Sequence, residues 1–140
     1  MIKDDLTLTG AVSIALNGKV VQEIPNLVVT AGKNWVADRM NNANTVMTHM
    51  AIGTSSTTAA VGQTTLVAET ARGALTSTNV SANVITYVET FAAGTGTAAL
   101  TEAGVFDAAS GGDMLCRTVF AVVNKGSADS MTITWSITVS

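Results

Sequence analysis

The stretch from Leu100 to Phe120, LTEAGVFDAASGGDMLCRTVF, predicts a complete β-hairpin. Two apolar-rich runs flank Ser110, Gly111 and Gly112, and they are built from the Val, Phe, Thr and Leu residues that strands favour. Glycine adopts the positive φ angles of a tight reversal without steric cost. Because the stretch holds no residue set that could run a reaction, we interpret it as architecture.

The same strand signals continue on both sides of this hairpin. Near the C-terminus, residues 132–139 alternate without exception between apolar and hydroxyl side chains, which predicts a half-buried strand with Trp135 facing inward. Near the N-terminus, residues 6–16 largely repeat the alternation, and Asn17-Gly18 then gives a strong hairpin signal before a strand at residues 19–24. The first thirty residues are therefore predicted to form a strand-rich meander.

The middle of the chain is predicted to hold one helix and several further strands. The helix is expected over residues 31–40, with Trp35 anchoring it to a sheet. A strand at residues 46–52 is followed by a surface loop at 53–62, and residues 65–80 read as one longer strand or two shorter ones. The remaining strands are predicted at residues 84–91, 100–106, 114–123 and 130–139.

About eight short strands and one brief helix predict an all-β fold, either an antiparallel β-sandwich or a jelly roll. The length of 140 residues matches one domain, and neither a repeat nor a linker divides residues 1–140. The first five residues form a candidate N-terminal arm that could lie along a neighbouring molecule: Met1, Ile2, Lys3, Asp4 and Asp5.

Charge and hydropathy narrow the range of partners. Only 12% of residues are charged and the net charge is -3, with the seven basic residues scattered, so no nucleic-acid partner is predicted. No run approaches the roughly 20 apolar residues of a membrane span, and the start lacks a secretory signal, so we expect a soluble protein without a membrane partner. Two explanations of the neutral exterior stay open: it is covered in an assembly, or threonine keeps it soluble.

Residues capable of catalysis or metal binding are few. The single histidine, His49, and the single cysteine, Cys116, could form a base and nucleophile pair, but no spacing or motif supports one. A zinc site would need three or four ligands. Asp107 and Asp113 bracket the glycine turn at a spacing that departs from a calcium-binding EF-hand loop. We therefore expect no enzyme activity, no catalytic residues, no metal and no cofactor.

One ion pair is predicted within the opening hairpin. Glu102 and Arg117 lie on its two arms, and they are diagonal neighbours on one face if Ala108 lies opposite Asp113. A register slip of one residue would send one of them to the other face. An exposed pair would stabilise the hairpin by at most about 1 kcal/mol. The pair is interpreted as structural, fixing the hairpin.

Three segments carry a resemblance to a known class of proteins. They are NLVVTAGKN at residues 26–34, HMAIGT at 49–54 and LTEAGVFD at 100–107. These segments resemble those of small virion proteins of tailed bacteriophages, which include capsid decoration (cement) proteins and modules of tail fibres. The likeness extends over roughly residues 26–139. It implies a β-sandwich or jelly roll, symmetric oligomers and no enzymatic activity, and it transfers no catalytic residue.

The resemblance leads to an expected function. We expect a capsid decoration protein, made in the host cytoplasm and placed on the capsid exterior of the virion. Its expected partners are the major capsid protein and its own copies, as a trimer. Two alternatives remain: a tail fibre or baseplate module with the same fold, and a carbohydrate-binding module displayed on the virion. The latter normally needs exposed aromatic side chains.

Overall fold

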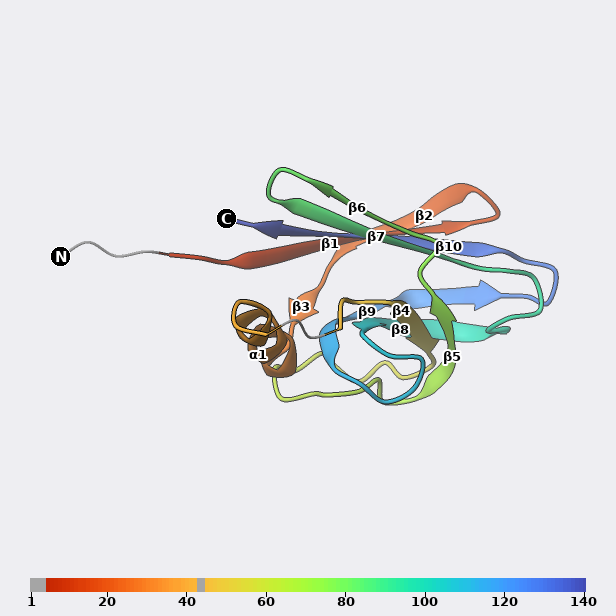
Figure 1. Ribbon diagram of the computed structural model, residues 1–140. Coiled ribbons are helices and arrows are strands. Elements are labelled where there is room, and N and C mark those ends of the chain that lie inside the picture. The colour runs from red at the N-terminus through yellow and green to blue at the C-terminus, as the bar shows by residue number, and fades with distance from the viewer. Residues whose placement is uncertain (1–4, 43–44) are drawn as a thin grey trace.

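The fold consists of two five-stranded antiparallel sheets that pack face to face (Figure 1). It is seen in a computed structural model that describes residues 5–42 and 45–140. The strand order is β2-β1-β10-β7-β6 in the first sheet, sheet A, and β3-β9-β8-β4-β5 in the second, sheet B. The predicted all-β sandwich is thus confirmed. The arm expected at Met1–Asp5 lies outside the described residues, except for Asp5.

Sheet A brings the two ends of the chain together. Its members are β1 (Leu8–Leu16), β2 (Lys19–Pro25), β6 (Ser77–Ser81), β7 (Val84–Phe91) and β10 (Met131–Val139). β1 pairs with β10 from Leu8 opposite Val139 to Leu16 opposite Met131. Asn17 and Gly18 both have positive φ, as the expected tight hairpin requires.

Sheet B contains the hairpin predicted from Leu100–Phe120. Its members are β3 (Leu27–Val28), β4 (His49–Gly53), β5 (Glu69–Ala74), β8 (Ala98–Phe106) and β9 (Met114–Lys125). β8 and β9 pair antiparallel, and Gly111 and Gly112 take φ values of 60° and 72° in the reversal between them. Both turn positions thus have the left-handed geometry that glycine adopts without cost.

The main core lies between the two sheets. The alternation expected at residues 132–139 places Ile133, Trp135 and Ile137 inside, and Trp135 is fully buried. Sheet B contributes Met50 and Leu100, among others, from the opposite side. The period-two pattern of the sequence therefore decides which face of each strand enters the core.

Two differences from the expected strands matter for the surface. The region expected as one or two strands at residues 65–80 divides into β5 and β6, which belong to different sheets, and the short β3 adds another strand. As a result there are ten strands in the described part of the chain rather than about eight. The expected loop is also longer, running from residue 54 to 68 between the paired strands β4 and β5.

A third layer covers the outer face of sheet B. It consists of the helix α1 (Thr30–Arg39) and the loop 54–68 (Figure 1). A second, small cluster of buried apolar residues lies on this side of the sheet: Val29, Ala51, Leu66, Phe106 and Met114. A Cβ at Gly32 would collide with the backbone of Leu115, so α1 rests directly on β9. No helix in the described ranges is long and apolar enough to cross a membrane.

Candidate functional site

Glu102 and Arg117 meet on the outer face of sheet B. Glu102 pairs with Val119 and Arg117 pairs with Gly104, so the two side chains are diagonal neighbours. Arg117 Nη2 lies 2.9 Å and Nε lies 3.2 Å from Glu102 Oε1. The structure therefore brings together the two residues that sequence reasoning placed on one face, and we call this pair the Glu102–Arg117 clamp.

The register reaches this arrangement through a bulge. The predicted register has Ala108 opposite Asp113, whereas it is the Asp107 amide that donates to the Asp113 carbonyl, at 3.2 Å. The pairing then shifts between Val105 and Phe106, which leaves one extra residue on β9. The bulge compensates for the one-residue difference at the turn and restores the diagonal relation farther up the hairpin.

The burial of the clamp corrects the sequence estimate. Both side chains are 0% exposed. The stabilisation of at most about 1 kcal/mol that was predicted for this pair applies only to an ion pair exposed to water. Breaking a buried pair by removing one partner costs about 3–5 kcal/mol, because the remaining charge is left without compensation. The loop 54–68 provides this burial by passing over the pair.

Glu102 joins the two ends of the loop. Its Oε2 accepts hydrogen bonds from the amides of Ser55, at 3.1 Å, and Ala68, at 2.8 Å. Its Oε1 accepts the Val67 amide at 2.9 Å. A Cβ at Gly53 would lie 2.6 Å from Glu102 Oε2, so the glycine provides the room that the carboxylate needs.

Arg117 holds the middle of the same loop. Its Nη1 donates to the carbonyl of Thr57 at 2.9 Å and to Gln63 Oε1 at 3.1 Å. Gln63 Oε1 also accepts the Ala60 amide at 2.9 Å. One buried ion pair therefore fixes the loop at its start, middle and end. This loop has no regular ladder of its own, so these side-chain contacts replace the backbone pairing that a strand would have.

Electrostatics keep Glu102 charged. Burial by itself raises the pKa of a carboxyl group. At Glu102 the hydrogen bonds from Val67, Ala68, Arg117 and Ser55 outweigh burial and hold its pKa below the ordinary range. The clamp is therefore a true ion pair at neutral pH.

Acid is expected to weaken the clamp. A group with a lowered pKa in the folded state contributes stability above its unfolded pKa, and this contribution is lost as the pH falls through the folded pKa. We expect the stability difference between the native protein and Glu102→Gln to be largest at pH 7 and to shrink as the pH falls below 4.5, the ordinary value for this carboxyl group. Urea unfolding followed between pH 7 and pH 3 measures it. A difference that does not change with pH would contradict the assignment.

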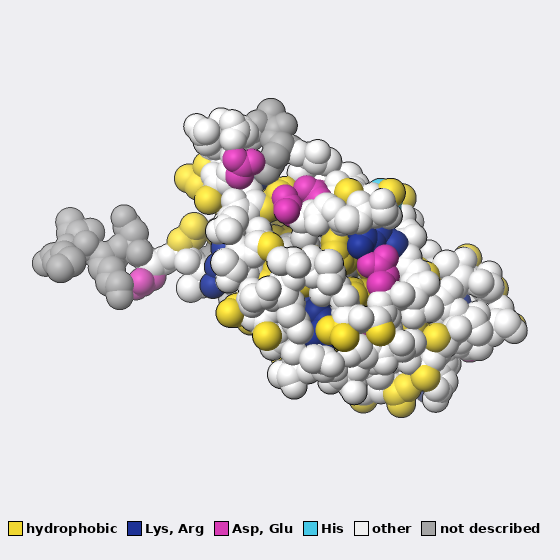
Figure 2. All heavy atoms as spheres, turned by 90° about the horizontal axis from the view of Figure 1, so that it is seen from below, with side chains coloured by type: hydrophobic (Ala, Val, Ile, Leu, Met, Phe, Trp, Pro, Cys, Tyr) yellow, Lys and Arg dark blue, Asp and Glu magenta, His cyan; other side chains and the backbone are white. Residues whose placement is uncertain are grey.

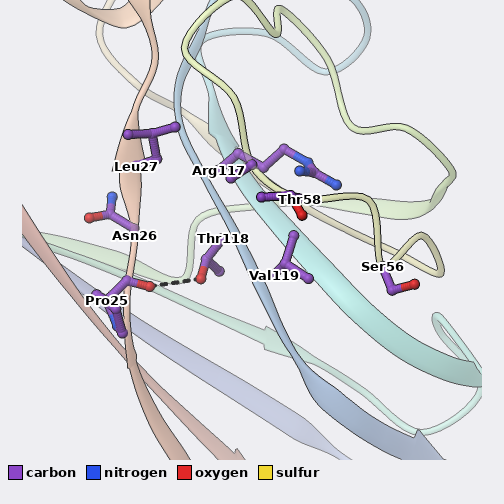
Figure 3. Close-up of a pocket in the computed structure, with 9 residues that line it drawn as sticks. Pro25, Asn26, Leu27, Ser56, Thr58, Arg117, Thr118 and Val119 are labelled. Atoms are coloured by element: carbon purple, nitrogen blue, oxygen red, sulfur yellow. Dashed lines mark hydrogen bonds between the residues drawn. The ribbon is translucent and has the colours of Figure 1, made fainter.

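A groove lies beside the clamp (Figure 3). It has a volume of about 360 Å³ and is lined by residues 25–27 and 117–119 together with loop residues Ser56, Thr58 and Ala59. Thr118 Oγ1 donates to the Pro25 carbonyl at 2.8 Å and ties β9 to the end of β2. Its lining mixes apolar residues, such as Leu27 and Val119, with polar ones, and it contains no aromatic side chain.

The aromatic side chains lie outside the groove. All six lie in the described ranges, and Tyr87, Phe91, Phe106, Phe120 and Trp135 are buried. The sixth, Trp35, is half-buried, and its Nε1 donates to the Thr45 carbonyl at 2.9 Å. None of them lines the groove as a stacking platform for a sugar.

His49 and Cys116 occupy structural positions. His49 lies in β4, where Thr48 Oγ1 is 2.8 Å from its Nδ1. Cys116 lies in β9, fully buried in the core between the sheets, and burial raises the pKa of its thiol. β8 separates the two strands. A thiol whose pKa is raised is a poor nucleophile at neutral pH.

The aspartates at the glycine turn also serve the fold. Asp107 Oδ1 accepts the Asp113 amide at 2.7 Å, which closes the turn. In the part of the chain that the structure describes, no group of three or more His, Cys, Asp or Glu residues could hold a metal ion.

A second arginine with a largely buried side chain, Arg72, was not anticipated from the sequence. Arg72 binds Glu69 through both carboxylate oxygens, at 2.7 and 3.1 Å, and donates to the carbonyls of Ala108 and Gly111 at 2.9 Å each. Its guanidinium also lies 3.8 Å from the centre of the Phe106 ring. These contacts tie β5 to the β8–β9 turn. A spacing of three puts two residues on opposite faces of a regular strand, so the strand pattern gave no signal for this pair.

Comparisons with known proteins do not identify the chain. No protein-family model matches it, and neither the curated proteins nor the solved structures contain a match.

Proposed function

We propose that this protein is a structural virion protein, specifically a capsid decoration (cement) protein that binds the outer shell and reinforces contacts between capsid subunits. The observation that carries the proposal is the Glu102–Arg117 clamp. In this clamp, two fully buried charged side chains hold a surface loop in one conformation. A surface that is ordered before binding loses less conformational entropy on association, which favours a binding role for the loop.

The surface held by the clamp is suited to contact with protein. Residues 54–68 include no charged residue, and Val61 and Val67 are 52% and 53% exposed. Seen from this side, uncharged atoms dominate and the charged side chains gather in a few places (Figure 2). The centres of protein interfaces are depleted of charged residues. Another protein can therefore cover this surface without burying a charged side chain that lacks a partner.

The three resembling segments lie on the same side of the molecule. Residues 26–34 include β3 and the first turn of α1, residues 49–54 include β4, and residues 100–107 include β8. All of these elements belong to sheet B or to the layer on it. The three segments thus lie in one part of the fold, although they are far apart in the sequence.

We propose that each copy stabilises the shell by adding buried surface area at its interfaces. Each copy, arranged as a trimer, would contact its own neighbours and the major capsid protein through small interfaces. Symmetry repeats these interfaces over the whole shell, so individually weak contacts add up to a large resistance against internal pressure.

The copy number per virion tests this function. We expect hundreds of copies, in a fixed ratio to the major capsid protein, when purified virions are analysed by quantitative mass spectrometry. A handful of copies would contradict the capsid assignment and favour a tail fibre or baseplate position. Specific binding on a glycan array, together with a low copy number, would favour the carbohydrate-binding alternative.

A matched pair of variants locates the binding surface within the same experiment. Val61→Asp places a charge on the loop and is expected to reduce the number of copies on the capsid. Val80→Asp places the same charge on β6 of the opposite sheet, where Val80 is 66% exposed. It is expected to leave the copy number unchanged. Equal loss in both variants would argue against the loop as the docking surface.

A further inference from the structure

A carboxylate occupies a core position on β7. Side chains alternate along this strand, and Glu89 follows Tyr87 and precedes Phe91 on the face that points into the sandwich. Both neighbours belong to the main core, and Glu89 itself is only 5% exposed. An ionised carboxylate at such a position needs compensation by hydrogen bonds or charge.

The compensation is incomplete. Thr76 Oγ1 donates to Glu89 Oε1 at 3.0 Å and accepts the Thr90 amide at 3.1 Å. Glu89 Oε2 is buried and has no hydrogen-bond partner in the described part of the chain. It lies 2.6 Å from the position that a Cβ would take at Gly73 of β5, so the carboxylate reaches from sheet A to the edge of sheet B.

This carboxylate lies where the chain crosses between the sheets. Leu75 and Thr76 connect β5 in sheet B to β6 in sheet A. The Leu75 amide donates to the Thr48 carbonyl at 2.9 Å, and the Thr76 amide donates to the Val88 carbonyl at 2.7 Å. Glu89 therefore binds Thr76, whose amide is bound to β7 of sheet A, while the amide of the preceding Leu75 is bound to Thr48, directly before β4 of sheet B.

We propose that Glu89 is a proton-operated tie between the two sheets: its neutral form holds the β5–β6 crossover in place, and loss of its proton loosens that crossover. The neutral acid is far cheaper to bury than the anion. Once ionised, the group gains hydration by moving away from Gly73, and we expect such a movement to weaken the hydrogen bond from Thr76.

The electrostatic surroundings agree with this role. Burial raises the pKa of Glu89, while the hydrogen bond from Thr76, the backbone amide of Thr90 and the charge of His49 on β4 oppose the rise without cancelling it. On β5, Glu69 and Arg72 bind each other. The other two strands packed beside β7, which are β6 and β10, carry no charged residue.

The direction of the pH effect follows from this shift. A carboxyl group whose pKa is raised on folding contributes stability below its unfolded pKa, and that contribution is lost as the pH rises through the folded pKa. The crossover is therefore tightest in acid and loosens as the pH rises above 4.5, the ordinary value for this carboxyl group. This direction is opposite to that of the Glu102–Arg117 clamp, so the two groups can be separated by their pH profiles.

Hydrogen exchange of the Leu75 and Thr76 amides tests the proposal. After correction for intrinsic exchange, we expect their protection to fall with rising pH by up to about tenfold per pH unit in this window, the limit for one proton. Glu89→Gln cannot ionise and is expected to give a flat profile. The matched control Glu23→Gln, an exposed acid on β2 of the same sheet, is expected to behave like the native protein.

A titration of the Glu89 carboxyl carbon by NMR provides a second, independent readout. Its midpoint is expected above the ordinary value, and Thr76→Val is expected to move it higher, because the variant removes a hydrogen bond that stabilises the anion. A midpoint at the ordinary value would overturn the proposal. The same holds if the native protein and Glu89→Gln show identical exchange profiles.

Discussion

Replacing Arg117 by methionine is expected to lower the free energy of unfolding by about 3–5 kcal/mol. The variant keeps most of the side-chain volume but leaves the Glu102 carboxylate fully buried without its counter-charge. It also removes the donor to Thr57 and Gln63 in the middle of the loop. Urea unfolding at pH 7, followed by circular dichroism, measures the loss.

A control variant and a double variant separate the ion pair from simple packing. Arg39→Met changes an exposed arginine on α1 and is expected to cost less than about 1 kcal/mol. Glu102→Leu combined with Arg117→Met removes both charges. We still expect it to be less stable than the native protein, because three loop amides lose their acceptor. A loss below about 1 kcal/mol for Arg117→Met would show that the pair is not buried as described.

The second large effect is expected at Trp135 in the centre of the sandwich. Trp135→Ala is expected to lower the free energy of unfolding by about 3–5 kcal/mol, because it leaves a cavity between the two sheets. Trp135→Phe is expected to cost less than half as much. It removes less volume, and it also removes the buried Nε1–H, which has no hydrogen-bond partner in the described residues.

Trp35 provides the comparison for this experiment. Its Nε1 donates to the Thr45 carbonyl at 2.9 Å, so Trp35→Phe removes a hydrogen bond that is made. The same substitution thus deletes an unsatisfied donor at one position and a satisfied donor at the other. Equal losses for Trp135→Phe and Trp135→Ala would contradict the assignment of Trp135 as a purely apolar anchor.

The sequence predicted the strands well because their signal is local. A half-buried strand alternates apolar and polar residues over a few positions, as residues 132–139 do, and a tight hairpin needs residues that accept positive φ, as Asn17 and Gly18 do. The β8–β9 hairpin was predicted for the same reason. The assignment of β5 and β6 to different sheets depends on long-range packing and left no such local signal.

The clamp was predicted in part. Its diagonal geometry follows from the hairpin alone, and sequence reasoning therefore identified Glu102 and Arg117 as partners. Their burial depends on the loop 54–68, which is held by side-chain contacts to its backbone and shows neither period two nor period 3.6. A segment of small and hydroxyl residues reads as an exposed loop, although this one encloses a buried ion pair.

Glu89 shows a signal that the sequence did contain. In VITYVETF, residues 84–91, the apolar face is Ile85, Tyr87 and Phe91, and Glu89 interrupts it. A charged residue in an otherwise apolar alternation marks either a register change or a buried carboxylate. The register is regular here, with Glu89 opposite Ile133, so the structure selects the second explanation.

The central claim is that the Glu102–Arg117 clamp holds the loop 54–68 as a preformed surface, and amide exchange at Ser55, Val67 and Ala68 tests it most directly. These three amides donate to Glu102. In the native protein we expect protection comparable to that of β8 and β9, and in Arg117→Met we expect all three to lose protection together while β1 and β10 keep theirs. Exchange of these amides at the rate of an unstructured peptide in the native protein would contradict the claim.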